Sequence, residues 1–228
     1  RAPGPAIGER PVPKIAEEAR TARRDQIIAA AAQCFARSGY HVTTMADIAE
    51  AARVSKGTPY LYFPGKEALF IALYEEWDCG LAARVDAAVA GLAEPARKSP
   101  RRILAAVASA IAAHVTGNPQ TCRVLMEATT LAAYEPAIAA KVQAASARTQ
   151  DQLTGLFQAG VTAGEWPPGT DPALQARLFT AGLYGLMAQW HTAPGSFCLE
   201  TAMAALAGTG AAGHSEDGGN SQAKGVGP

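Results

Sequence analysis

Apolar and polar positions along most of the chain recur with the period of an α-helix, and strand-like alternation is almost absent. Ile27, Ala31 and Phe35 stand at every fourth position, with Ile28 beside the first of them. This spacing predicts a helix over residues 21–38. Gly39 follows it and suits a helix end, because glycine accepts a positive φ.

Prolines and glycines divide the rest of the body into further helices. Pro100, Pro119, Pro136 and Pro172 each stand where the first turn of a helix tolerates a missing amide. Two short helices are expected near residues 44–52 and 55–61. Longer ones are expected near 66–92, 100–116, 119–133, 136–163, 172–192 and 196–207. We therefore expect an all-α protein of about nine helices.

The two ends of the sequence differ from this body. The first 13 residues hold four prolines, and residues 208–228 hold seven glycines and almost no large apolar side chains. We expect an extended arm over residues 1–19 and a flexible tail over 208–228.

Composition narrows the function classes. The 228 residues carry 20 basic and 20 acidic side chains, and 49% of the residues are hydrophobic. A wholly disordered chain is excluded, and any nucleic-acid role must rest on local charge. The four cysteines are far apart and form no Cys-x-x-Cys pair, which argues against a metal site or a disulfide framework and fits a reducing, cytoplasmic compartment. No signal peptide or membrane span is indicated.

The most informative segment spans residues 43–70. Thr44 and Asp47 form a Thr-x-x-Asp pattern, a variant of the capping box, at the start of the first short helix. A turn is expected at residues 52–54, after which Ser55 would cap the second short helix. Two short helices joined by a tight turn make a helix-turn-helix.

Residues 20–70 resemble the DNA-binding domain of the TetR/AcrR family of transcriptional regulators. The matching runs are Thr-Thr-x-x-Asp-Ile-Ala from Thr43, Val-Ser-Lys-Gly-Thr from Val54 and Tyr-x-Tyr-Phe-x-x-Lys-Glu-x-Leu from Tyr60. The resemblance implies a three-helix DNA-binding domain over 20–66 and a larger effector-binding and dimerisation domain over 67–207. It also implies a homodimer on a palindromic double-stranded DNA operator, with no catalytic residue and no cofactor.

Local charge and residue chemistry agree with a DNA-binding role. Residues 20–66 hold seven basic and three acidic side chains, a net charge of +4 inside a neutral chain. The residues expected to contact DNA are Thr44, Arg53, Ser55, Lys56, Gly57, Thr58, Tyr60, Tyr62 and Lys66. Lys56 would reach guanine or phosphate, and the free amides beside Lys66 would hold a phosphate. Either tyrosine could instead serve mainly in packing.

Two residues depart from the usual family pattern. Arg53 stands at the turn position where the family usually has glycine, and positive φ there costs an arginine on the order of 1 kcal/mol. The turn is therefore either reshaped, or Arg53 reaches towards phosphate. Pro59 stands where leucine is common; it could touch a thymine methyl, although a structural role is favoured.

The helix expected over 172–192 is apolar on nearly all sides, so it needs a partner on each side. We expect a homodimer through it and the helix after it, with an interface at Leu174, Leu178, Ala181, Gly182, Gly185 and Ala188. Residues that mix aromatic area with polar groups are candidates for an effector pocket. They are Trp77, Leu81, Ile111, His114, Met126, Thr129, Gln150 and Tyr184.

The leading hypothesis is a repressor released from DNA by a small apolar or amphipathic effector. A second hypothesis is a DNA-binding protein that acts constitutively or under a protein partner, without an effector. An enzyme is disfavoured, because the sequence holds no nucleophile elbow, His-Glu-x-x-His or glycine-rich phosphate loop.

Overall fold

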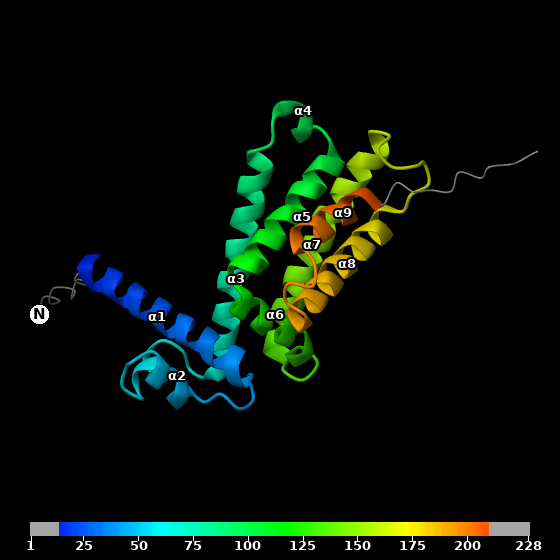
Figure 1. Cartoon of the computed structure of the whole chain (residues 1–228). Coiled ribbons are helices and arrows are strands. Elements are labelled where there is room, and N and C mark those ends of the chain that lie inside the picture. Colours follow the sequence, from blue (N-terminus) through cyan, green and yellow to red (C-terminus); the bar gives the residue numbers. More distant parts are fainter. Residues whose placement is uncertain (1–13, 210–228) are drawn as a thin grey trace, which may run out of the picture.

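All regular structure in the computed structural model is helical over residues 14–209, the part of the chain that it describes (Figure 1). The elements are α1 (Lys14–Ser38), α2 (Met45–Ala51), the 3₁₀ helix η1 (Thr58–Leu61), α3 (Lys66–Ala90), α4 (Glu94–Arg97), α5 (Pro100–Gly117), α6 (Pro119–Leu131), α7 (Pro136–Thr162), α8 (Pro172–Thr192) and α9 (Leu199–Thr209). The expected all-α class is confirmed over this range. None of these helices is both long and apolar enough to cross a bilayer.

Most helix boundaries fall where proline and glycine predict them. α8 has the expected bounds, and α5, α6 and α7 likewise begin at their prolines. Gly39 follows α1 with φ of 78°, and its amide donates to the Phe35 carbonyl at 2.8 Å. These local signals hold because they act within one turn of the residue that carries them.

Some boundaries were predicted wrongly. α1 begins at Lys14 rather than at residue 21, because residues 14–20 hold no proline and are rich in alanine and glutamate, which favour helix. α9 spans Leu199–Thr209 rather than 196–207, so helix enters the stretch expected to be a tail. The short α4 was not predicted. The rest of the expected arm and tail, 1–13 and 210–228, lies outside the described residues.

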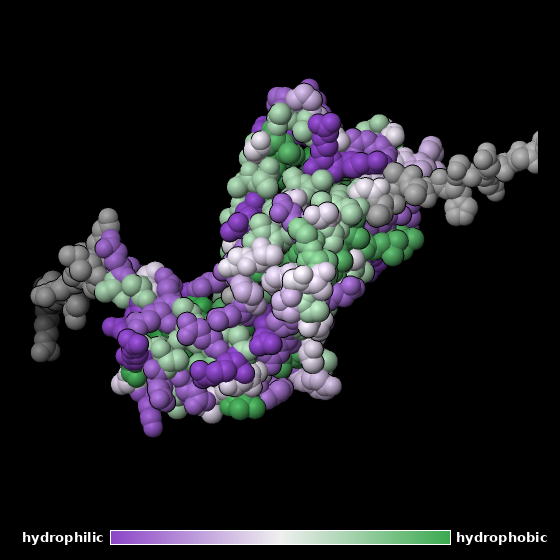
Figure 2. Space-filling view, in the orientation of Figure 1, coloured by the Kyte–Doolittle hydropathy of each residue, from purple (hydrophilic) through white to green (hydrophobic). Residues whose placement is uncertain are grey.

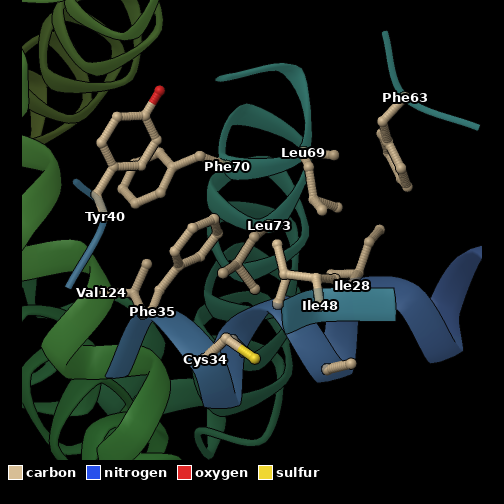
Figure 3. Close-up of a cluster of buried hydrophobic side chains, with 14 of the residues drawn as sticks. Ile28, Cys34, Phe35, Tyr40, Ile48, Phe63, Leu69, Phe70, Leu73 and Val124 are labelled. Atoms are coloured by element: carbon tan, nitrogen blue, oxygen red, sulfur yellow. The ribbon is translucent and has the colours of Figure 1, made fainter. Parts of the chain in front are cut away.

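An N-terminal core forms where α1, α2 and the first half of α3 meet (Figure 3). Ile27, Ile28, Ala31 and Phe35 of α1 are all buried, as their spacing predicts. Phe70 lies with its ring centroid 5.5 Å from that of Phe35 and 5.2 Å from that of Tyr40, in both cases edge to face. Edge-to-face aromatic pairs add packing energy beyond the area that they bury, so this cluster fixes α1 against α3.

A second core lies between α5, α7, α8 and α9. Phe157, Phe179 and Trp166 meet there edge to face, with centroids of the first two 6.1 Å apart. Trp166 comes from the loop between α7 and α8, and its ring lies directly against Gly160, where any Cβ would collide with it. Residue 160 must therefore be glycine for this loop to pack on α7.

Two helices, α6 and α7, contribute to both cores, and α3 extends from the N-terminal core along the larger body. α3 places Leu69 and Phe70 in the N-terminal core, and farther along it brings Trp77 against His114 of α5. α6 places Val124 in the N-terminal core, whereas Cys122 lies in the second. The N-terminal unit is thus joined to the larger helical body by α3, by α6 and by α7, which places Ile138 in the N-terminal core and Phe157 in the second.

Candidate nucleic-acid interface

α2 begins at a complete capping box. The Thr44 hydroxyl accepts from the Asp47 amide at 3.2 Å, and the Thr44 amide donates to the Asp47 carboxylate at 2.8 Å. Hydrogen bonds from the Thr44 hydroxyl and amide lower the pKa of the exposed Asp47 carboxyl. The expected cap is therefore present, and Ile48 and Ala49 face the core as predicted. The same bonds engage the Thr44 hydroxyl within the chain.

The turn after α2 keeps the geometry that the family pattern assigns to glycine, although the residue there is Arg53. Its φ is 54°, and it is the one non-glycine residue with positive φ among those described. The Val54 amide donates to the Ala49 carbonyl at 2.9 Å, and the Gln26 side-chain amide holds the Ala52 carbonyl at 2.7 Å. These bonds offset a conformational cost of roughly 1 kcal/mol and leave the Arg53 side chain exposed.

The second helix of the motif differs from the expectation. It is a 3₁₀ helix over Thr58–Leu61, and Lys56 and Gly57 belong to the turn that leads into it. The Ser55 hydroxyl lies 2.7 Å from the Thr58 hydroxyl and caps no helix amide. Pro59 is buried, which gives it the structural role and removes the proposed contact with thymine.

The outward surface of this segment contains most of the expected contact residues. Ser55, Lys56 and Gly57 are exposed, and Tyr60 is 56% exposed. Tyr62 is half-buried and packs against the N-terminal core, so Tyr60 is the more exposed of the two tyrosines. Leu61 is 76% exposed beside Tyr60 and was missed, because the sequence does not reveal that Pro59 and Tyr62 take the inward positions of this segment.

Lys66 does not point a free ammonium outward as expected. Its Nζ donates to the Tyr40 carbonyl at 2.6 Å and to the His41 carbonyl at 3.2 Å, and it lies 4.5 Å from the Tyr40 ring centroid. Lys66 therefore holds the loop after α1 onto the start of α3. No side chain caps the first amides of α3 behind Gly65, so the expected backbone donors are still present there.

Polar side chains gather over α1 and α2, in contrast with the more apolar larger body (Figure 2). Arg24 is neutralised by Glu76 at 2.9 Å, and the carboxylate comes from α3. Arg20, Arg23, Arg53 and Lys56 remain exposed cations on the N-terminal unit. The local excess of positive charge thus faces solvent, where a phosphate backbone could reach it.

The candidate pocket residues differ in their burial and in their partners. Trp77 and His114 do meet, with ring centroids 5.2 Å apart, and the Gln150 amide donates to the Thr180 hydroxyl at 2.9 Å. Thr129 is exposed, and so is Tyr184 at 42%. The other three are half-buried: Leu81, Ile111 and Met126.

The Trp77–His114 pair carries unused hydrogen-bonding capacity. Trp77 Nε1 and both ring nitrogens of His114 are buried with no partner among the described residues. Burial and the positive charge of Arg84 lower the pKa of His114, so the ring is neutral at pH 7. A neutral imidazole beside an indole N–H offers a ligand two donors and one acceptor.

One face of α8 is buried and the opposite face is apolar but open. Phe179, Leu183 and Met187 lie in the second core, whereas Leu174 and Leu178 are 50% and 56% exposed. The remaining predicted interface residues lie around this open face: Ala181 is exposed, and Gly185 and Ala188 are half-buried.

Gly182 is an exception within this predicted interface. The position of its absent Cβ lies 3.0 Å from Leu206 of α9, so the close approach that it permits occurs within the chain. Gly185 has open space at the same position.

Both parts of the chain match models of known protein families. Residues 27–73 match the model of the bacterial regulatory proteins of the tetR family, and residues 100–209 match the C-terminal model of BetI-type transcriptional repressors. These matches coincide with the N-terminal unit and the larger helical body described above.

Three similar proteins illustrate the match. The HTH-type transcriptional repressor Rv1474c of Mycobacterium tuberculosis is 40% identical over 65 residues, 28% of this chain and 35% of that protein. The transcriptional activator FasR of Mycolicibacterium smegmatis is 31% identical over 140 residues, 60% of each chain. The regulator FadR of Bacillus subtilis, solved with stearoyl-CoA, superposes with a TM-score of 0.70 at 24% identity, covering 81% of this chain and 95% of that one.

The matches cover different shares of the related proteins. The alignments with the first curated relatives cover about a third of those proteins or less. The similarity to FadR shows a shared fold over most of the chain. With one family model on each of its two parts, the chain belongs to the TetR family of transcriptional regulators.

Proposed function

We propose that the protein is a repressor that binds a palindromic DNA operator in the cytoplasm as a homodimer and is released by a small apolar or amphipathic effector. The observation that carries the proposal is the outward surface of residues 55–61, set on a capped and buried scaffold. The protein is proposed to act by binding alone, without catalysis.

DNA reading is assigned to the exposed part of this segment. Lys56 supplies a cation, Gly57 lets the backbone approach closely, and Tyr60 supplies a hydroxyl. Leu61 adds an apolar group of the kind that contacts thymine methyls. Arg53 lies on the neighbouring turn, where its exposed guanidinium suits phosphate. Thr44 and Lys66 are assigned the supporting role of holding the segment in place.

Dimerisation is assigned to the open face of α8. Leu174 and Leu178 expose apolar area there, and Gly185 leaves room for a close neighbour. Association of two copies would bury this area. A two-fold pair could then present its two reading segments about 34–36 Å apart, the separation of successive major grooves on one face of DNA.

Effector binding is assigned to the larger body around Trp77 and His114. Unpaired buried polar atoms are rare in folded proteins, and a ligand is one explanation for them. The stearoyl-CoA in the Bacillus subtilis FadR structure supports an amphipathic compound as the first probe. An effector would release DNA only to the extent that it binds the released conformation more tightly.

The test begins with capture of genomic DNA by the purified protein, followed by footprinting. On the operator so found, Lys56→Ala should weaken binding about tenfold or more, because a good base contact is worth about 1–3 kcal/mol. Lys98→Ala is the matched control, since Lys98 is an exposed lysine near α4, on the larger body. Unchanged operator affinity in Lys56→Ala would refute the assignment of the reading segment.

Effector response is tested on the same operator complex. Stearoyl-CoA should release the DNA. It should also change the tryptophan fluorescence of wild type, and Trp77→Phe should abolish that change. A wild-type complex unaffected by stearoyl-CoA and by a panel of apolar metabolites would favour the alternative, a constitutive or partner-controlled DNA-binding protein.

A further inference from the structure

A groove lies at the junction of the N-terminal unit and the larger body, away from the Trp77–His114 pair. It has a volume of about 490 Å³ and is lined by residues of α1, α6 and α8. They are Gln33, Ala36, Arg37, Pro119, Gln120, Arg123 and His191. This volume falls in the range of about 300–1,000 Å³ that is usual for small-molecule sites.

The lining is cationic and rich in donors. Arg37 and Arg123 contribute two guanidinium groups, and no acidic side chain lines the groove. Outside the lining, the Thr44 hydrogen bonds and, more weakly, the nearby Arg37 guanidinium lower the pKa of the Asp47 carboxyl. Glu127 accepts from the Tyr40 amide at 2.7 Å. Two guanidinium groups in one concave site whose lining holds no acid favour an anion.

Arg123 is held in place by the walls of the groove. Its Nε donates to Nε2 of His191 on α8 at 3.0 Å, and its Nη1 donates to the Ala36 carbonyl of α1 at 3.1 Å. Nη2 has no partner among the described residues and remains a donor. His191 must be neutral to accept this bond, which leaves its Nδ1 carrying a proton.

The start of α6 adds donors on a third side. Pro119 and Gln120 are its first residues, and no side chain caps its first turn, because the Asn118 side chain instead donates to the His114 carbonyl at 3.1 Å. The open first turn of a 13-residue helix carries free amides and a partial positive charge. Donors from several directions match a tetrahedral phosphate better than a planar carboxylate.

We propose that this groove binds the phosphate group of a small metabolite. Such a ligand would contact Arg37 on the N-terminal unit and Arg123 on the larger body at once. It would therefore bias the orientation of the DNA-binding unit relative to the body. By linkage, the factor by which the phosphate ligand changes the affinity for DNA must equal the factor by which DNA changes the affinity for the phosphate ligand.

The experiment is calorimetric titration of the full chain with inorganic phosphate, adenosine 5′-monophosphate and acetate at matched ionic strength. Arg37→Gln removes one cation, and Gln120→Glu places a carboxylate in the groove. The carboxylate also favours the first turn of α6, so it should leave the fold intact. Arg102→Gln on α5 is the control, as an exposed arginine outside the groove.

Both phosphate probes should bind wild type and the Arg102→Gln control, acetate should bind more weakly, and each groove variant should lose about tenfold in affinity. Tighter binding of the monophosphate than of inorganic phosphate would identify an ester as the ligand; equal binding would identify the free ion. Equal affinity for phosphate in all four proteins would overturn the proposal. The proposal would also be overturned if wild type bound no phosphate and the groove variants lost operator affinity, because the groove would then contact the DNA backbone.

Discussion

The two cores of the molecule treat buried polar groups differently. In the N-terminal core the buried Thr43 hydroxyl donates to the Gly39 carbonyl at 2.8 Å and also lies 3.2 Å from the Cys34 carbonyl. Over residues 14–209, the buried side-chain nitrogens without a partner all belong to the larger body: Trp77 Nε1, Arg101 Nε, His114 Nδ1 and Nε2, and Trp166 Nε1.

This difference shows which core satisfies its buried polar groups within the chain. A buried polar atom without a partner costs about 1–3 kcal/mol, so the hydrogen bonds of the buried Thr43 hydroxyl favour a single arrangement of the N-terminal core. The larger body retains unpaired atoms at Trp77 and His114, and a bound molecule could pair with them. This difference agrees with the proposed division between a DNA-reading unit and an effector-binding body.

The largest expected effect comes from opening the aromatic cluster of the N-terminal core. Phe70→Ala should lower the free energy of unfolding by about 3–5 kcal/mol, because a fully buried ring is lost between Phe35 and Tyr40. Chemical denaturation followed by circular dichroism measures the loss. Leu61→Ala, at an exposed site, should change stability by less than about 0.5 kcal/mol. Similar losses in the two variants would mean that the cluster is not the source of rigidity.

A matched pair of substitutions compares the polar groups directly. Thr43→Val should cost about 1–2 kcal/mol, since it removes a hydroxyl whose hydrogen bonds are made. His114→Leu should be nearly neutral or stabilising, since it removes ring nitrogens that have no partner. Denaturation of the two variants in the same buffer gives both values. The contrast between the cores fails if His114→Leu costs as much as Thr43→Val.

The smallest effect is a pH dependence that separates the same two variants. The folded pKa of His114 lies below the unfolded value of about 6.5, so below that pH the unfolded chain binds a proton that the folded chain does not. Wild-type stability should therefore fall as pH decreases from about 6.5 towards the folded pKa, by at most about 1.4 kcal/mol per pH unit.

The variants show which group is responsible for that fall. Thr43→Val should keep it, whereas His114→Leu should lose it. Asp47, whose folded pKa is also lowered, contributes only at lower pH, below its unfolded value of about 3.9. Parallel pH profiles for wild type and His114→Leu would show that His114 gains its proton in the folded state as readily as in the unfolded state.

Sequence reasoning succeeded where structure is decided within a few residues. The cap at Thr44 and the proline-led helices α5 to α8 depend on backbone chemistry close to the residue that signals them. For Arg53 the sequence left a reshaped turn open, and its φ of 54° excludes that alternative. The buried face of α1 also followed from spacing alone, because a regular helix fixes which side chains share a face.

It failed where the outcome depends on distant neighbours. Lys66 was expected to face solvent, yet the loop after α1 supplies two carbonyls to its ammonium. The pocket candidates were chosen because they mix aromatic area with polar groups, but residue type does not reveal which element covers a position, and Tyr184 proved to be exposed. Gly57 and Pro59 together reduced the second motif helix to a 3₁₀ turn, because neither favours a helix interior.

Gly160 and Gly185 should differ in the substitutions that they tolerate. A saturation library sorted for folded monomers should retain glycine at 160, where the Trp166 ring fills the place of a side chain, and should accept alanine or serine at 185, where the chain leaves open space. If selection for repression in living cells rejects the same substitutions at 185, the constraint must come from outside the single chain. The pattern of survivors would then outline the footprint of a second subunit without any structure of the pair.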